Sequence, residues 1–295
     1  MKNMTDDILN KFIAGFKEGY FIRVGSKKHD IFIGKDDEGR YCFEYRGSFS
    51  PVKVIGSKPL AVNQYKTEDE NLILRFSLDY NELIGCFSAF CEDLVLSVQD
   101  MPDGNATYKT LVSRYQAWRK LFKPNRTNLS EFEIQGLIGE LLFMRDYGIP
   151  HWGIDVALES WTGPENTHKD FSNGDNWFEI KTITTGKETV RISSIEQLDS
   201  EVDGVLCIYS LEKMSPSFNG IKLNALVGEL CSKLSLCQKD ELLNKLVLFG
   251  YDFEPANDNY VYAVTDLSSF SVRTGFPRLE RTNVPLPISK VIYDI

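Results

Sequence analysis

The sequence lacks the features that define several common protein classes. It contains no run of about 18 apolar residues, so no membrane-spanning helix is expected. Residues 1–64 lack the basic, then apolar, then small-residue pattern of a signal peptide. No G-x-x-x-x-G-K-[ST] loop and no G-x-S-x-G motif occur, so neither P-loop nucleotide hydrolysis nor serine-hydrolase chemistry is expected. We therefore expect a cytoplasmic protein with a different chemistry.

Cysteine and histidine are too sparse for a structural zinc site. The chain has 6 cysteines and 3 histidines, and no two cysteines form a C-x-x-C pair. A structural zinc ion needs four such ligands at close spacing. We expect reduced, mostly buried thiols, which fits a cytoplasmic location.

The charge balance is acidic, with a net charge of −9. Such a balance argues against a protein that coats nucleic acid without selection. Residues 107–126 nevertheless contain basic side chains and no acidic one, within a predicted amphipathic helix over residues 108–122. Lys109, Lys120 and Lys123 are candidates for contact with phosphate, and a solvated helix face is the alternative.

The chain is long enough for two domains. After a short amphipathic helix in residues 1–20, strand-like runs occupy residues 20–24, 30–34, 41–45, 60–65 and 72–78, and a buried helix is expected over 82–98. The turn-forming segment Pro102-Asp103-Gly104-Asn105 then interrupts the chain. We predict a β-rich N-terminal module over residues 1–104 and a second domain over residues 105–295.

The second domain is predicted to be α/β. A helix over 130–147 begins at a capping box of Ser130 and Glu133, and Gly136 and Gly139 favour its close approach to a sheet. The expected elements that follow are strands at 154–159, 168–172 and 177–183, a short helix at 193–198, a strand at 204–209, helices at 223–236 and 240–248, and strands at 260–264 and 284–293. The order α-β-β-β-α-β indicates a mixed central sheet flanked by helices.

Four residues form the candidate site. Glu179 and Lys181 flank one residue on a predicted strand, so their side chains share a face. Asp170 lies on that face too if the preceding hairpin has an even number of loop residues, as at Asn173-Gly174 or Gly174-Asp175. The predicted helix brings Glu140 near the strands. Asp175 is an alternative first acid, although its position favours a turn.

This set of groups suits phosphodiester hydrolysis. Mg²⁺ binds one or two carboxylates and keeps several waters, while a lysine can align water and neutralise developing charge. An acid-x-lysine triplet alone is a weak signal, because it also occurs as an exposed ion pair. The upstream aspartate at hairpin distance and the capped helix with its glutamate strengthen the interpretation.

These motifs resemble the PD-(D/E)XK nuclease superfamily. The closest likeness is to a bacterial branch that is found in phage-defence gene neighbourhoods. The segments that carry it are Gly139-Glu140-Leu141-Leu142, Trp161-Thr162-Gly163-Pro164, His168-Lys169-Asp170-Phe171, Glu179-Ile180-Lys181-Thr182 and Ile192 to Leu198. Lys169 stands where the superfamily name has proline.

The resemblance implies a restriction-endonuclease-like core and roles for the site residues. Asp170 and Glu179 would bind Mg²⁺ or Mn²⁺, Glu140 would help directly or through water, and Lys181 would act on the attacking water. His168 and Gln197 are accessory candidates, with a surface histidine and helix packing as the alternatives. DNA, protein partners from the same defence system and a homodimer are the implied partners.

The sequence therefore predicts a metal-dependent DNA endonuclease in restriction or phage defence. A second hypothesis is a catalytically weak scaffold subunit that uses the nuclease fold to bind DNA or proteins. An RNA-processing nuclease fits less well, because that chemistry needs no paired metal-binding acids.

Overall fold

The computed structural model describes residues 5–57, 59–67, 71–119, 129–165, 167–174, 176–285, 288 and 291–295. The polypeptide forms two compact units. The first comprises Met1–Asn128 with Asn224–Asn257, and the second comprises Leu129–Leu223 with Asp258–Ile295. The chain thus leaves the first unit after residue 128 and returns to it for residues 224–257. The domain boundary at residues 104 and 105 stays a prediction.

The first unit contains an antiparallel sheet in the strand order β1-β2-β3-β5-β4. The five predicted strand-like runs are confirmed as β1 (Phe21–Arg23), β2 (Asp30–Lys35), β3 (Tyr41–Gly47), β4 (Leu60–Lys66) and β5 (Leu72–Leu78). The helices are α1 (Thr5–Ala14), the short η1 (Asn81–Leu83), α2 (Ile84–Val98), α3 (Asn105–Trp118), α7 (Leu223–Ser232) and α8 (Leu236–Phe249).

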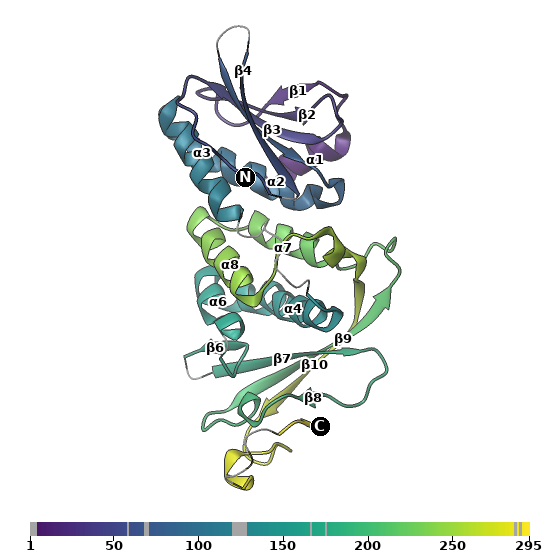
Figure 1. Cartoon of the computed structure of the whole chain (residues 1–295). Coiled ribbons are helices and arrows are strands. Elements are labelled where there is room, and N and C mark those ends of the chain that lie inside the picture. Colours follow the sequence, from purple (N-terminus) through teal and green to yellow (C-terminus); the bar gives the residue numbers. More distant parts are fainter. Residues whose placement is uncertain are drawn as a thin grey trace. The chain divides into compact units, whose positions relative to one another are not determined.

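Helices α2 and α3 lie against one face of this sheet (Figure 1). Phe76 of β5 meets Phe90 of α2, with ring centroids 5.3 Å apart. Trp118 at the end of α3 stacks on Phe253, at 6.0 Å. This packing explains why α3 and residues 224–257 belong to the first unit.

The second unit contains a four-stranded mixed sheet in the order β10-β9-β7-β6. Its strands are β6 (Phe171–Asn173), β7 (Asn176–Thr184), β9 (Gly204–Met214) and β10 (Val261–Val272), with β7 and β9 parallel. A two-stranded pair joins β8 (Arg191–Ile192) to β11 (Tyr293–Asp294). The predicted α/β class with a mixed sheet is confirmed.

Helix α4 (Glu131–Phe143) covers one face of this sheet (Figure 1). The predicted capping box is present, with Ser130 accepting from the Glu133 N–H and the Glu133 carboxylate accepting from the Ser130 N–H at 2.7 Å. A Cβ at Gly139 would lie only 2.4 Å from Thr182 Cγ2, so glycine permits the close approach of α4 to β7. The same role predicted for Gly136 is wrong, because a Cβ there would meet nothing within 4 Å.

The opposite face of the sheet is covered by an apolar cluster. Val190, Ile192 and Leu198 pack there against Leu206 and Ile208 of β9. The segment between β7 and β9 thus forms the layer on this face of the sheet, where Trp177 of β7 belongs to the same cluster.

Several predicted elements differ from the structure. The predicted strand at 154–159 is helix α6 (Ile154–Ser160), which follows the π-helical turn η2 (Met144–Gly148) and α5 (Ile149–Trp152). Its neighbouring buried residues, Ala157 and Leu158, form one side of a helix rather than alternate faces of a strand. The order α-β-β-β-α-β is therefore wrong at its first strand.

Further differences are smaller. The segment at 193–198 forms only the 3-10 turn η4 (Ile195–Gln197), and the predicted helix at 223–236 ends at Ser232. Among the described residues of the tail at 284–293, the last one alone enters a strand, β11. The remaining short turns are η3 (Gly163–Glu165), η5 (Pro255–Asn259) and η6 (Arg281–Asn283). Among the described residues, no helix combines the length and the apolar character that crossing a bilayer requires.

Candidate active site

The hairpin of β6 and β7 sets the positions of the acidic residues. Phe171 pairs with Phe178 and Asn173 with Asn176, so two residues form the loop, as one of the predicted alternatives requires. Continuing this register places Asp170 opposite Glu179. The Asp170 carboxylate accepts a hydrogen bond from the Ile180 main-chain N–H at 2.7 Å, which fixes it beside β7.

Glu179 and Lys181 project from the same face of β7. Lys181 Nζ lies 2.7 Å from Glu179 Oε1. Glu179 is only 1% exposed, and among the described residues its Oε2 has no hydrogen-bond partner. A buried carboxylate oxygen without a partner is costly, so this atom is a candidate ligand for a cation.

Glu140 reaches the same site from α4. Its Oε2 accepts a hydrogen bond of 2.6 Å from Trp161 Nε1, and the side chain is 8% exposed. A Cβ at Gly163 would lie 2.9 Å from Glu140 Oε2 and 3.3 Å from Asp170 Oδ1. The two oxygen atoms are therefore no farther apart than the sum of these distances, and glycine leaves them the space.

Burial raises the pKa of all three carboxyl groups, and Asp170 adds to the shift at Glu179 and Glu140. Burial and the nearby Asp170 raise the pKa of Glu179 to about 8. Burial and Asp170 also raise the pKa of Glu140 well above its ordinary value, and burial raises the pKa of Asp170. Burial opposes the charge of Lys181, but Glu179 and Asp170 outweigh it and raise the pKa of the ammonium group. The site thus gathers three acidic groups whose charged forms burial disfavours, beside Lys181 and the nearby Lys169.

The donor set fits a hard divalent cation. Such an ion prefers oxygen ligands, and Mg²⁺ needs only one or two carboxylates because waters complete its shell. Among the described residues, no three His, Cys, Asp or Glu side chains converge as a complete cage. Glu179 Oε2 and the Asp170 carboxylate are the groups best placed to hold an ion, with Glu140 next to them.

The accessory candidates have different environments. His168 is exposed on the surface. The Gln197 side chain accepts from the Ser193 N–H at 2.8 Å, so it stabilises its own turn. Of the three lysines predicted to contact phosphate, Lys109 is exposed on α3 in the first unit, whereas Lys120 and Lys123 lie outside the described residues, as does Asp175.

The sequence interpretation gave no role to three residues that shape the site. Trp161 holds Glu140, Gly163 leaves space beside the two acids, and Lys169 joins the site to the following turn. Lys169 Nζ donates to the main-chain oxygens of Glu196 and Gln197 at 2.8 and 2.7 Å. Burial lowers the pKa of Lys169 to about 8. The quoted motif segments contain all three residues, but nothing in the sequence indicates these contacts.

In a comparison with known protein families, the chain matches one family. Residues 17–295 match the family described as "Putative PD-(D/E)XK family member, (DUF4420)". No curated protein and no solved structure matches the chain.

Proposed function

The chain belongs to this PD-(D/E)XK family, and from that premise we propose that it is a metal-dependent endonuclease that hydrolyses phosphodiester bonds in DNA. The proposal extends to a restriction-endonuclease-like core, to a cytoplasmic location and to a role in restriction or phage defence. Mg²⁺ is the proposed cofactor, and Mn²⁺ is expected to substitute for it.

The proposed roles follow from the positions of the side chains. Asp170 and Glu179 would hold the metal ion, and Glu140 would contribute directly or through water. A bound divalent ion supplies Lewis-acid polarisation of the phosphate and lowers the pKa of a bound water. Lys181 orients the attacking water and neutralises charge that develops on the phosphate oxygens.

The observation that carries the proposal is the state of Glu179. Its carboxylate is buried, its pKa is raised to about 8, and its Oε2 lacks a hydrogen-bond partner among the described residues. Glu179 also has acidic neighbours in the same site, whereas an isolated structural ion pair with Lys181 would not bring Asp170 and Glu140 beside it. Perturbed proton affinity in a cluster of acids is typical of functional sites.

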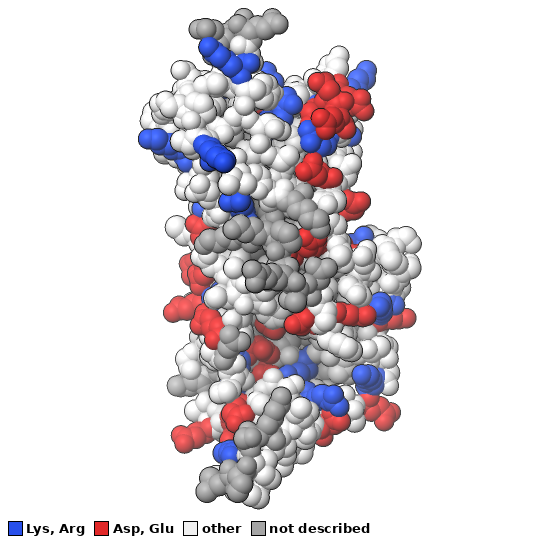
Figure 2. Space-filling model, viewed as in Figure 1, with Lys and Arg blue, Asp and Glu red and all other residues white. Residues whose placement is uncertain are grey.

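The distribution of charge fits a nuclease that holds DNA locally. On the face shown in Figure 2, acidic and basic side chains are interspersed, and no broad surface of one sign dominates. We therefore expect phosphate contacts to be concentrated near the site rather than spread over the molecule.

The test is nicking of supercoiled plasmid DNA by purified protein with Mg²⁺, with Mn²⁺ and with EDTA. Wild type should nick with either metal and not with EDTA, and Asp170→Ala and Lys181→Ala should be inactive while remaining folded. Equal activity of all three proteins would overturn the proposal. DNA binding without nicking under any metal condition would support the alternative, a catalytically weak DNA-binding subunit.

A further inference from the structure

A groove continues from the candidate active site along β7. It has a volume of about 590 Å³, within the range of about 300–1,000 Å³ that small-ligand sites occupy. Lys181 lines it, so the groove begins at the proposed catalytic lysine. A groove of this size can hold part of one nucleic-acid strand.

The floor of the groove is an unpaired edge of β7. Strand β6 pairs with β7 only at residues 176–178, whereas β7 runs on to Thr184 with β9 on one side alone. The Ile180 N–H on the open side binds the Asp170 carboxylate. Because main-chain groups alternate in direction along a strand, the N–H and C=O of Thr182 also face the open side. No strand among the described residues pairs with them.

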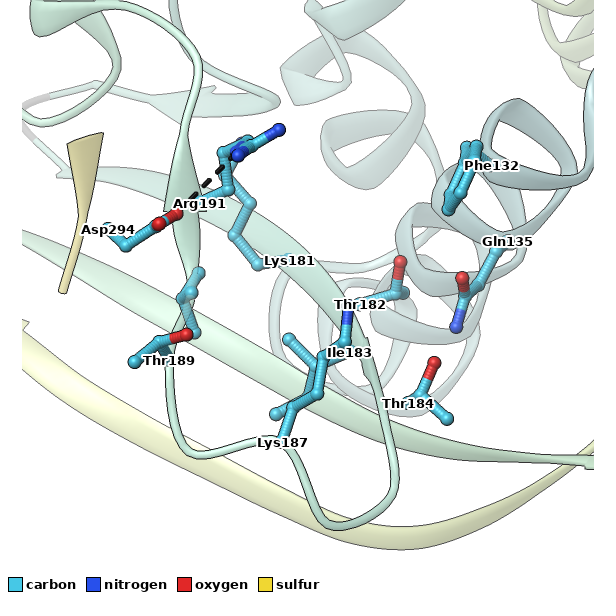
Figure 3. Close-up of a pocket in the computed structure, with 11 residues that line it drawn as sticks. Phe132, Gln135, Lys181, Thr182, Ile183, Thr184, Lys187, Thr189, Arg191 and Asp294 are labelled. Atoms are coloured by element: carbon cyan, nitrogen blue, oxygen red, sulfur yellow. Dashed lines mark ion pairs between the residues drawn. The ribbon is translucent and has the colours of Figure 1, made fainter. Parts of the chain in front are cut away.

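One wall comes from α4. Figure 3 shows Phe132 and Gln135 projecting from this helix on one side of the groove. Phe132 is 81% exposed, although it is a large apolar side chain. Gln135 is buried, and among the described residues no hydrogen bond to its amide group is found. An exposed ring next to an amide without partners can bind the face and the edge of a nucleobase.

The opposite wall is basic. Lys187 and Arg191 line it, and both side chains are exposed. The only acid among the lining residues is Asp294, which lies 3.5 Å from Arg191 (Figure 3). An ion pair this exposed is weak, so a phosphate can replace Asp294 at the guanidinium group. Lys181 is already paired with Glu179, so Lys187 and Arg191 are the two cations of this wall that a phosphate can reach.

We infer that this groove binds a single-stranded segment of the substrate next to the scissile phosphate, with Phe132 stacked on an unpaired base and with Lys187 and Arg191 on the phosphates. The inference rests on the proposed nuclease function and adds a preference for DNA with unpaired nucleotides. The separation of an aromatic wall from a cationic wall favours a nucleotide strand over an extended peptide, which would need only the free strand edge.

The test is the binding of a fluorescein-labelled single strand of about 16 nucleotides, and of the matching duplex, by the full chain in EDTA, measured by anisotropy. Phe132→Ala should weaken single-strand binding about tenfold, and Phe132→Trp should restore it. Phe270→Ala removes an exposed ring outside the groove, and it should change the affinity less than about twofold.

The contribution of the cations that bind phosphate is measured separately, from the salt dependence of the affinity. The double variant Lys187→Ala, Arg191→Ala should reduce the slope of log affinity against log salt by about 0.7 for each phosphate that is no longer neutralised. Arg273→Ala, at an exposed arginine that does not line the groove, should leave the slope unchanged.

Three results would overturn the assignment. They are equal affinity of wild type for duplex and single strand, unchanged single-strand binding by Phe132→Ala, and displacement of the oligonucleotide by an extended acidic peptide at equal concentration. Binding is measured without metal, so its outcome is independent of cleavage. A wild type that binds through the groove but never nicks DNA would refute the nuclease and leave the groove assignment standing.

Discussion

Two buried glutamates, one in each unit, show how differently the chain treats buried charge. Glu44 on β3 of the first unit is 0% exposed, and both of its oxygens have guanidinium partners. Arg75 Nε donates to Oε1 at 2.6 Å, and Arg46 Nη2 donates to Oε2 at 2.7 Å. Glu179 in the second unit is equally buried, but only Lys181 contacts it directly, one of its oxygens has no partner among the described residues, and Asp170 and Glu140 lie in the same site.

The contrast separates a structural charge from a functional one. Two arginines donate hydrogen bonds to the two oxygens of Glu44, so its buried charge is compensated within the protein. The cluster around Glu179 costs stability, because three buried carboxyl groups have only Lys181 and the nearby Lys169 as cations. Proteins retain such destabilising arrangements where catalysis or binding requires them. The following changes test this distinction, from the largest expected effect to the smallest.

Removal of the lysine should abolish most of the activity while the protein still folds, because Glu179, with its pKa raised to about 8, can keep a proton. Lys181→Ala is expected to lower the rate of plasmid nicking by about 10²–10³-fold, because charge on the phosphate is no longer neutralised. Lys213→Ala changes an exposed lysine of β9 and should alter the rate less than about twofold. Similar rates for the two variants would show that Lys181 has no special role.

Removal of an arginine that pairs with Glu44 should lower the stability of the protein and leave its activity unchanged. Arg75→Ala leaves one oxygen of a buried carboxylate unpaired and should destabilise the protein by about 3 kcal/mol, measured by urea unfolding. Arg23→Ala removes a more exposed ion pair with Asp30 and should cost at most about 1 kcal/mol. Nicking per folded molecule should not change in either variant. A stable Arg75→Ala protein would contradict the structural role of this pair.

Neutralising an acid of the site should stabilise the protein in a pH-dependent way. Glu140 has a raised pKa, so the folded state keeps a proton that the unfolded chain loses above its ordinary pKa. Wild type therefore loses stability as the pH rises, whereas Glu140→Gln does not titrate. Glutamine can still accept the hydrogen bond from Trp161.

The expected gain for Glu140→Gln at pH 8 is about 1 kcal/mol, or roughly 2–4 °C in the melting temperature, and it should vanish near pH 5. Calorimetry at the two pH values measures it. A variant less stable than wild type at pH 8 would show that the Glu140 carboxylate supports the fold instead of straining it.

The sequence predicts the shared face of the acids on the β6–β7 hairpin better than it predicts the residues that surround them. An even-numbered hairpin loop was enough to place Asp170 on the face of Glu179 and Lys181, because period and parity are local properties. The choice between the two loop positions came only from the strand register. The capping box likewise marked the start of α4.

What the sequence did not predict depends on contacts between distant segments. The strand expected at 154–159 is a helix, since tertiary packing of Ala157 and Leu158 overrides a short ambiguous pattern. The bond from Trp161 to Glu140 and the space at Gly163 arise only once α4, η3 and β7 come together. The return of residues 224–257 to the first unit is a packing outcome of the same kind.

The most direct test of metal binding at Glu179 is a Mn²⁺ titration of the protein, followed by electron paramagnetic resonance between about pH 6 and pH 9. Wild type should bind Mn²⁺ with an affinity that rises as the pH passes through about 8, because the ion competes with the proton on Glu179. Glu179→Gln should remain folded and lose this binding. Absence of Mn²⁺ binding by wild type, or equal binding by Glu179→Gln, would contradict the assignment of the site.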